Sequence, residues 1–185
     1  DNICNSIHLP LQAGSNRILK RMNRTYSQIE FIGLAKKIKK RIPNVGLSTD
    51  IIVGFPGETN SDFKETLEVM KKIKFDSAFN FIYSPRRGTK ASEYDDQITE
   101  IEKKERLIKV IDLQKKHTLY NNKALIGSTQ KVLIEKESKM SSLDWAGRTD
   151  SNKWVIFKKE KSKIGDMVNV KIKDAIGVSL KGRID

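Results

Sequence analysis

The sequence predicts an α/β protein in which three strand–helix units are followed by a small antiparallel β-barrel. In residues 1–125, short apolar runs alternate with helical stripes, and the run at 47–55 lacks the alternation of a half-exposed strand. Such a run is typical of a parallel strand that is covered on both faces. Beyond Gly127 the pattern changes to short β-rich runs separated by Gly, Asp, Asn and Ser, which favours an antiparallel barrel of about five strands.

The elements of the first part are predicted from periodicity and capping residues. Ser27 with Glu30, and Thr59 with Asp62, have the spacing of capping boxes, and Leu34 belongs to the apolar stripe of the first of these helices. The expected strands are 6–11, 47–55 and 77–84, and the expected helices are 15–22, 27–41, 59–73 and 99–125. Three parallel strands do not close a barrel and leave an exposed edge. We therefore expect this part to be half of a larger domain, and the start without Met agrees.

The second part is predicted as a separate β domain, so the expected boundary lies between residues 125 and 126. Alternation is clear at Val168, Val170 and Ile172, as expected for strands with one face in a core. The expected strands are 129–138, 145–150, 153–157, 166–175 and 177–184.

Composition limits the class of protein. With 185 residues, 37% hydrophobic and 32% charged, the chain suits a globular protein with a modest core. No apolar run approaches the roughly 18–20 residues of a membrane span, so we expect no membrane association. The one cysteine excludes an internal disulfide and favours a reducing cytoplasm. The net charge of +13 favours a polyanionic partner, nucleic acid first; lysines that serve only solubility are the alternative.

Ligands of α/β proteins bind at the carboxyl ends of the parallel strands. The segments 8–15, 50–58 and 83–89 lie at these ends in the predicted topology. Gly54 allows backbone to approach a ligand closely. Asp50 lies inside an apolar strand, where a carboxylate needs a partner; this partner would be ligand hydroxyls or a basic residue of a neighbouring strand. Glu58 would cap the next helix or tether the loop.

Three segments in this order carry a family resemblance: HLPLQAGSNRILKRMNR, STDIIVGFPGET and FDSAFNFIYSPRRGT. They resemble the radical S-adenosylmethionine (SAM) enzymes, specifically the methylthiotransferases, and among these the tRNA-2-methylthio-N(6)-dimethylallyladenosine synthases. The segment GRTDSNKWVIF resembles the C-terminal TRAM domain of these enzymes, an OB-like RNA-binding barrel. The resemblance covers essentially the whole chain. It implies half of a radical SAM βα barrel at residues 1–125 and a TRAM domain at 126–185.

The resemblance also implies a SAM site. Its residues would be Gln12, Arg24, Asp50, Ile52, Gly54 and Tyr83. Gln12 would contact SAM, and the planar guanidinium of Arg24 would pair with the carboxylate of SAM. Asp50 would contact the ribose. Ile52 follows two residues later on the same strand face and would pack on the adenine.

Substrate contacts are implied in two places. Arg86, Gly88 and Thr89 match the RxGT loop of the family, but this chain reads PRRGTKA where the family usually reads PRPGTPA. Arg87 and Lys90 thus replace two prolines, and we expect a more flexible and more basic loop. A plain surface connection is the alternative for this loop.

The β domain would bind RNA through its basic residues. Arg148, Thr149 and Lys153 are the expected contacts. The aromatic residues Trp145, Trp154 and Phe157 are interleaved with lysines, and aromatic rings can stack on bases. A place in the core is the alternative for Trp154.

The chain lacks the CxxxCxxC run whose thiolates hold a 4Fe–4S cluster in this family. Cys4 stands alone and is expected to be a small buried or edge residue. His8 is either a metal ligand or a hydrogen-bonded residue at a strand end. We therefore expect no catalytic residue and no metal ligand in this chain, and no activity of the chain by itself.

For the full-length protein the resemblance implies methylthiolation at the 2-position of isopentenyladenosine next to the tRNA anticodon. Two 4Fe–4S clusters, SAM as radical source and methyl donor, and an electron donor are implied with it. A close alternative changes the substrate to threonylcarbamoyladenosine in tRNA or to a small-subunit ribosomal protein. A noncatalytic RNA-binding adaptor is the alternative from another class.

Overall fold

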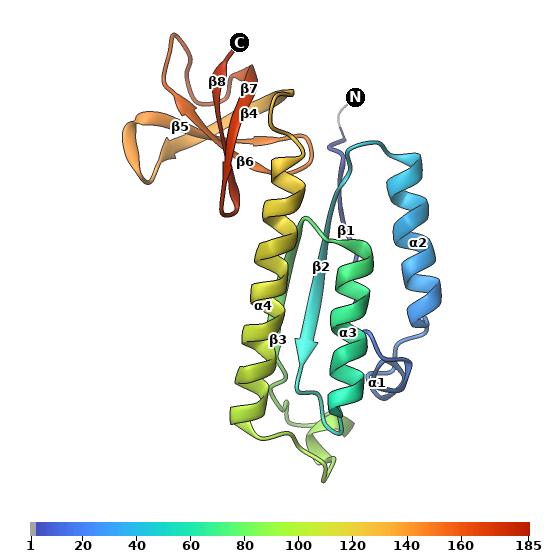
Figure 1. The fold of residues 1–185 in the computed structure, drawn as a ribbon. Coiled ribbons are helices and arrows are strands. Elements are labelled where there is room, and N and C mark those ends of the chain that lie inside the picture. Colours follow the sequence, from blue (N-terminus) through green and yellow to red (C-terminus); the bar gives the residue numbers. More distant parts are fainter. Residues whose placement is uncertain (1–2) are drawn as a thin grey trace. The chain divides into compact units, whose positions relative to one another are not determined.

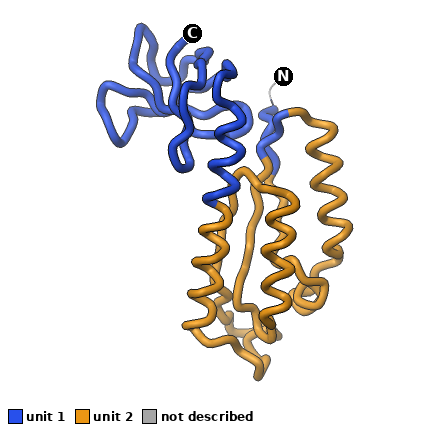
Figure 2. The backbone as a smooth tube through the Cα atoms, in the orientation of Figure 1, with its two compact units in different colours: residues 1–7, 44–46, 115–185 blue, residues 8–43, 47–114 orange. Residues whose placement is uncertain are grey.

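A computed structural model of the protein describes residues 3–185 and divides the chain into two compact units. Unit 1 comprises residues 1–7, 44–46 and 115–185, and unit 2 comprises residues 8–43 and 47–114 (Figure 2). Unit 2 holds most of a parallel sheet and its helices, whereas unit 1 holds a closed β-barrel. The predicted fold class, a partial βα barrel followed by a small β-barrel, is confirmed.

The sheet has three strands in the order β1-β2-β3, formed by Ser6–His8, Gly46–Val53 and Ser77–Ile82. Strands β2 and β3 pair in parallel, with Asp50 opposite Phe79 and Ile52 opposite Phe81. Strand β1 is shorter than predicted, and Pro10, which has no N–H to donate to a ladder, follows it closely. The chain rejoins the sheet through an isolated bridge between Gln12 and Ile51.

Helices cover one face of this sheet. The helices α2 (Gln28–Arg41), α3 (Asn60–Ile73) and the first part of α4 (Glu100–Lys123) run beside the strands (Figure 1). Leu47, Thr49 and Ile51 of β2 are fully buried. The other face is open, because Phe79 and Phe81 of β3 are 58% and 50% exposed. The expectation that the β2 run is covered on both faces is therefore wrong for residues 3–185. In a closed βα barrel the open face would be the interior.

The helix caps agree with most of the predictions. Both capping boxes, Ser27 with Glu30 and Thr59 with Asp62, are present. Leu34 is 46% exposed, so the apolar stripe of α2 is narrower than predicted. Ser15 stands at the N-cap of α1 (Asn16–Arg21), but its side chain makes no cap hydrogen bond. The short 3-10 helix η1 (Lys90–Glu93) lies in the loop between β3 and α4.

The barrel closes in the order β4-β5-β6-β8-β7. Its strands are Thr129–Ser138, Ser141–Thr149, Trp154–Lys158, Met167–Ile176 and Ser179–Ile184. All neighbours pair antiparallel except β6 and β8, which are parallel. Closure removes unpaired strand edges. The core includes Val132, Ile134, Val155, Phe157 and Ile172. Within residues 3–185, no helix has the length and apolar content that crossing a membrane would require.

Candidate functional site

A pocket of about 1030 Å³ lies in unit 2 where β2 and β3 end. Of the six residues predicted to bind SAM, five line this pocket, namely Gln12, Arg24, Asp50, Ile52 and Tyr83. Gly54 does not line it. The loop after β3 contributes further lining residues, including Arg86 and Thr89. Gln12 and Thr89, which are 77 positions apart in the chain, thus reach one cavity, because the carboxyl ends of parallel strands meet at one edge of the sheet.

Gln12 is held in an uncommon backbone conformation. Its φ is +66°, in the left-handed region that costs a residue with a Cβ roughly 1–2 kcal/mol. The sheet imposes this conformation, because the Gln12 N–H donates to the Asp50 carbonyl at 2.8 Å and its own carbonyl accepts from the Ile52 N–H at 2.8 Å. Strained backbone of this kind clusters at ligand sites. Sequence reasoning identified the residue but not its conformation.

Asp50 and His8 lie within ion-pair distance of each other on the open face of the sheet. The distance from His8 Nε2 to Asp50 Oδ2 is 3.3 Å, and His8 Nδ1 lies 2.9 Å from the Ser48 hydroxyl. One carboxylate oxygen of Asp50 therefore has a basic partner from the neighbouring strand β1, which was one of the two alternatives predicted for this residue. Within residues 3–185 the other oxygen, Oδ1, has no hydrogen-bond partner, so it remains available to a ligand.

His8 is a hydrogen-bonded residue at the end of β1, as one of its two alternatives stated. Among the described residues, no group of three or more His, Cys, Asp or Glu side chains could hold a metal ion. Cys4 is a free, exposed thiol just before the edge strand β1, which agrees with an edge position and not with the buried position that was its alternative.

Arg24 reaches the pocket through a turn directly after α1. Asn23 takes the left-handed conformation with φ +57°, and the Arg24 N–H donates to the Leu19 carbonyl at 2.9 Å. The Arg24 side chain is exposed, and residues 3–185 give it no ion pair or hydrogen bond. Burial raises the pKa of the neighbouring Tyr26 phenol, which the charge of Arg24 partly offsets. A guanidinium without a partner beside a cavity is suited to bind a carboxylate.

Tyr26 fastens the segment before Gln12. Its hydroxyl donates to the carbonyls of Pro10 and Leu11, at 3.1 Å and 3.0 Å. This contact holds the irregular backbone between β1 and the Gln12 bridge, and it was not predicted from the sequence.

The turn after β2 is fixed by a buried ion pair. Glu58 is 2% exposed, and its Oε2 accepts from the Gly54 N–H and from Arg106 Nη1 of α4, both at 2.6 Å. The loop-tethering alternative for Glu58 is confirmed, while Thr59 caps α3. Phe55 in this turn packs edge-on against Tyr83, with ring centroids 5.0 Å apart. The turn therefore shapes one wall of the pocket. Arg106 was missed, because it follows Glu58 by 48 positions and no local pattern connects them.

Asp62 joins α1 to the start of α3. Its carboxylate accepts from the Ser15 hydroxyl at 2.6 Å, from the Arg17 guanidinium and from Thr59. Burial alone would raise the pKa of Asp62, but these hydrogen bonds outweigh it and hold the pKa well below its usual range. The sequence predicted only the capping role of this residue.

The RxGT segment forms a tight turn at the mouth of the pocket. The Arg86 carbonyl accepts from the Thr89 N–H at 3.1 Å and from the Thr89 hydroxyl at 2.8 Å. Gly88 has φ +82°, as required at the third position of a type II turn. Arg86 and Thr89 line the pocket, whereas Gly88 only shapes the turn. Among residues 3–185 the side chains of Arg86 and Arg87 have no ion pair.

The three residues predicted to bind RNA in unit 1 have different environments, and Lys153 Nζ donates to Asn122 Oδ1 at 3.2 Å. Arg148 is exposed on β5, pairs with Glu135 at 2.6 Å and donates to Asn152 at 2.9 Å. Thr149 is only 5% exposed, and its hydroxyl accepts from the Lys153 N–H at 3.1 Å. Its side chain thus holds the β5–β6 turn.

Of the interleaved aromatic residues, Trp154 is half-buried and lies outside the barrel core. Lys136 Nζ and the Arg148 guanidinium lie 4.4 Å and 5.3 Å from its centroid. Trp145 and Phe157 belong to the barrel core, so the expectation that they stack on bases is wrong. The alternation along β6 places Phe157 inside and Trp154 outside.

Comparison with known proteins shows which families the chain is similar to. Residues 1–70 match the family model of the radical SAM superfamily, and residues 123–184 match that of the TRAM domain. A tRNA-2-methylthio-N(6)-dimethylallyladenosine synthase of Christiangramia forsetii is 50% identical over 98% of this chain and 38% of its own length. A synthase of the same name from Clostridium tetani is 48% identical over 98% of this chain and 40% of its own length. The predicted family resemblance is confirmed.

A solved structure shares the fold. A chain described as coproporphyrinogen III oxidase (HemN) from Escherichia coli, a radical SAM enzyme, superposes with a TM-score of 0.53 at 14% identity, over 79% of this chain and 41% of that chain. This likeness concerns the fold alone. The chain spans about 40% of the length of the curated relatives it matches.

Proposed function

We propose that this chain, with a radical SAM match at its start and a TRAM match at its end, is the part of a tRNA-2-methylthio-N(6)-dimethylallyladenosine synthase that completes the SAM pocket and binds tRNA. The observation that carries this proposal is the identity of 50% over 98% of the chain. The proposed domains are half of the radical SAM barrel at residues 1–125 and the RNA-binding barrel at 126–185.

The residues of the pocket suit SAM in size and chemistry. The unpaired Arg24 guanidinium would bind the carboxylate of SAM. The free oxygen of Asp50, whose other oxygen contacts His8, would accept from the ribose hydroxyls. Ile52 and Tyr83 would flank the adenine, and Gln12 would donate or accept at the edge of the ligand. Gly54 would act indirectly, by letting the turn after β2 pack closely.

When bound, SAM would supply a carbon-centred radical after one-electron reduction, and a second SAM would supply the methyl group. The proposed full-length protein therefore needs two 4Fe–4S clusters and an electron donor, and works in the cytoplasm. We place the cluster ligands outside this chain, because its single cysteine cannot provide a CxxxCxxC set. The chain by itself would be inactive.

The β-barrel would contribute tRNA affinity. Arg148 is exposed beside the half-buried ring of Trp154, and basic and aromatic side chains together can bind phosphate and stack a base. Lys153 would add a second positive charge, and Thr149 would hold the turn between them. The RxGT turn of Arg86, Gly88 and Thr89 would approach the modified nucleoside from the mouth of the pocket.

Analysis of tRNA nucleosides by mass spectrometry tests the proposal. In cells that lack the gene we expect 2-methylthio-isopentenyladenosine to disappear and unmodified isopentenyladenosine to accumulate. The full-length gene should restore the nucleoside, and a variant with the cluster cysteines replaced should not. Unchanged levels of this nucleoside would reject the substrate. Loss of a threonylcarbamoyladenosine derivative, or of a ribosomal-protein modification, would then identify the alternative substrates, and restoration by the cysteine variant would favour the adaptor.

A further inference from the structure

The mouth of the pocket has an excess of positive charge that the SAM site does not use. Its lining contains five basic residues and one carboxylate, that of Asp50. Arg21 is neutralised by Asp96 at 2.8 Å. The exposed side chains of Lys20, Arg86 and Lys90 have no ion pair within residues 3–185. Unpaired cations around a cavity attract an anion larger than a single carboxylate.

Two basic residues in this region, Arg87 and Lys90, have side chains that make none of the contacts holding the turn. The turn is held by the backbone and hydroxyl contacts of Thr89 with the Arg86 carbonyl. The start of η1 is held by the Ser92 N–H, which donates to the Thr89 carbonyl at 3.0 Å. The side chains of Arg87 and Lys90 take no part in these contacts and are exposed. Their charges are therefore free for a partner.

We propose that Arg87 and Lys90 bind backbone phosphates of the RNA substrate at the mouth of the pocket. This inference rests on the proposed function, because it takes tRNA as the substrate. Arg87 stands at the second position of the Arg86–Thr89 turn and Lys90 directly after it, so the two side chains flank the segment that approaches the nucleoside. Phosphate contacts position RNA without reading its sequence, and they would hold the target nucleoside over the pocket.

Proline replacements at Arg87 and Lys90 distinguish the effect of side-chain charge from the effect of backbone conformation. Proline is favoured at the second position of a type II turn and at the first position of a helix, which Lys90 occupies in η1. Thr89, before Lys90, is extended with φ −102° and ψ +141°, as a residue before proline must be. The double variant Arg87→Pro/Lys90→Pro should keep the turn and lose both charges. Arg87→Gln/Lys90→Gln loses the charges without stiffening the loop.

Binding of an unmodified anticodon stem-loop RNA to the full-length protein, measured by fluorescence anisotropy at several salt concentrations, tests this inference. Both double variants should bind about five- to tenfold more weakly at roughly 0.1 M salt. The slope of log affinity against log salt should become less steep by between about 1 and 2. An unrelated hairpin should lose affinity equally. Arg87→Lys/Lys90→Arg should retain the wild-type slope, and SAM affinity should be unchanged in every variant.

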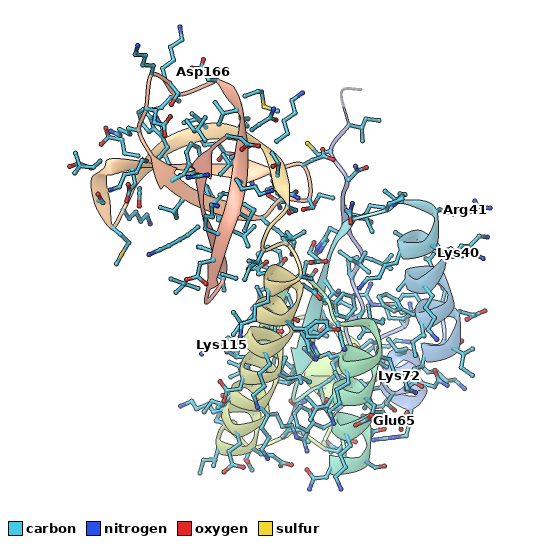
Figure 3. The ribbon with its side chains drawn as sticks, turned by 45° about the horizontal axis from the view of Figure 1, so that its top comes forward. Lys40, Arg41, Glu65, Lys72, Lys115 and Asp166 are labelled. Carbon is cyan, nitrogen blue, oxygen red and sulfur yellow. The ribbon has the colours of Figure 1, made fainter. Side chains whose placement is uncertain are left out.

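A matched control comes from the opposite end of unit 2. Lys40 and Arg41 lie at the C-terminal end of α2, which runs antiparallel to β2 and therefore ends far from the pocket (Figures 1 and 3). Lys40→Gln/Arg41→Gln removes the same charges and should leave the salt slope unchanged.

Three outcomes would overturn the inference. The first is that the variants at Arg87 and Lys90 behave like this control. The second is that only the glutamine variant loses affinity while the proline variant keeps it, which would assign the effect to loop stiffness. The third is that the wild-type protein binds neither RNA, which would reject the inference and the proposed substrate together. If the wild-type protein binds RNA and the variants bind it with the same affinity, only the inference is rejected.

Discussion

At the scale of single residues, the pocket combines side chains that are free with backbone that is constrained. Arg24 has no partner within residues 3–185, and Asp50 uses one oxygen only. Gln12 is kept in the left-handed region by two backbone hydrogen bonds to β2. Free polar groups on a fixed backbone suit ligand binding, because little reorganisation is needed when the ligand arrives.

Replacement of Arg24 tests the carboxylate contact. We expect Arg24→Ala in the full-length protein to weaken SAM binding by about 10- to 100-fold, since a charge-assisted hydrogen bond contributes roughly 1.5–3 kcal/mol. Isothermal titration with SAM measures the change. Arg41→Ala, at an exposed arginine that does not line the pocket, should leave SAM affinity unchanged. The Arg24→Ala variant should keep its affinity for tRNA. Equal SAM affinity of the Arg24→Ala and Arg41→Ala variants would contradict the assignment of Arg24 to the carboxylate of SAM.

Replacement of Gly54 tests whether the close packing of the turn after β2 stabilises the protein. Its φ is +70°, and a Cβ at this position would lie 2.3 Å from Cγ of Lys103. Gly54→Ala should therefore lower the free energy of unfolding by about 1–3 kcal/mol. Gly33→Ala is the matched control, because Gly33 lies within α2 and its Cβ would meet nothing within 4 Å; there the helix should gain up to about 1 kcal/mol. Urea denaturation distinguishes them, and equal effects would reject the role of the turn.

At the scale of elements, local patterns predicted caps well and long-range partners poorly. The two capping boxes follow from residues three positions apart, and both are present. The contacts of Glu58 with Arg106 and of Asp62 with Ser15 join residues more than 40 positions apart. Such pairs depend on how α1, α3 and α4 pack, which no local pattern contains. The five pocket-lining residues that are predicted to bind SAM were chosen through a family resemblance, not through periodicity.

The contact between α1 and α3 should depend on pH. The pKa of Asp62 is lowered on folding, so its stabilising contribution is present above the pKa of the unfolded chain, near 4, and is lost as the pH falls through the folded value. Asp62→Asn should cost about 1–3 kcal/mol at pH 7, and the difference from wild type should shrink below about pH 4. Denaturation at several pH values measures this. Asp95→Asn, at an exposed carboxylate, should show neither effect; a cost independent of pH would contradict the ionic role of Asp62.

At the scale of the whole molecule, the order of elements was predictable and the division into units was not. The change from helical to two-residue periodicity near Gly127 marks the β-barrel in the sequence. The compact unit begins earlier, at Lys115 within α4. Helical periodicity is continuous across Lys115, so no sequence signal marks that position. The open face of the sheet was also hidden, because β2 has the apolar run of a strand covered on both faces while only one face is covered.

The early start of this unit predicts how much chain the barrel needs. Leu119 and Leu125 of the α4 region pack against the barrel core, and a segment of residues 126–185 lacks both. We expect the segment Lys115–Asp185 to be more stable than 126–185 by about 1–3 kcal/mol, from the apolar area that the two leucines bury. Urea denaturation followed by tryptophan fluorescence measures the difference.

The two segments should differ in stability but not in RNA binding. Residues 126–185 carry 13 basic and 8 acidic residues, so both segments should bind tRNA with an affinity that falls steeply with salt. Within the longer segment, Leu119→Ala/Leu125→Ala should reproduce the loss of stability, whereas Lys116→Ala, at an exposed position, should not. Equal stability of the two segments would show that the barrel is complete from residue 126. RNA binding that does not change with salt would show that the basic residues of the barrel do not cause this binding.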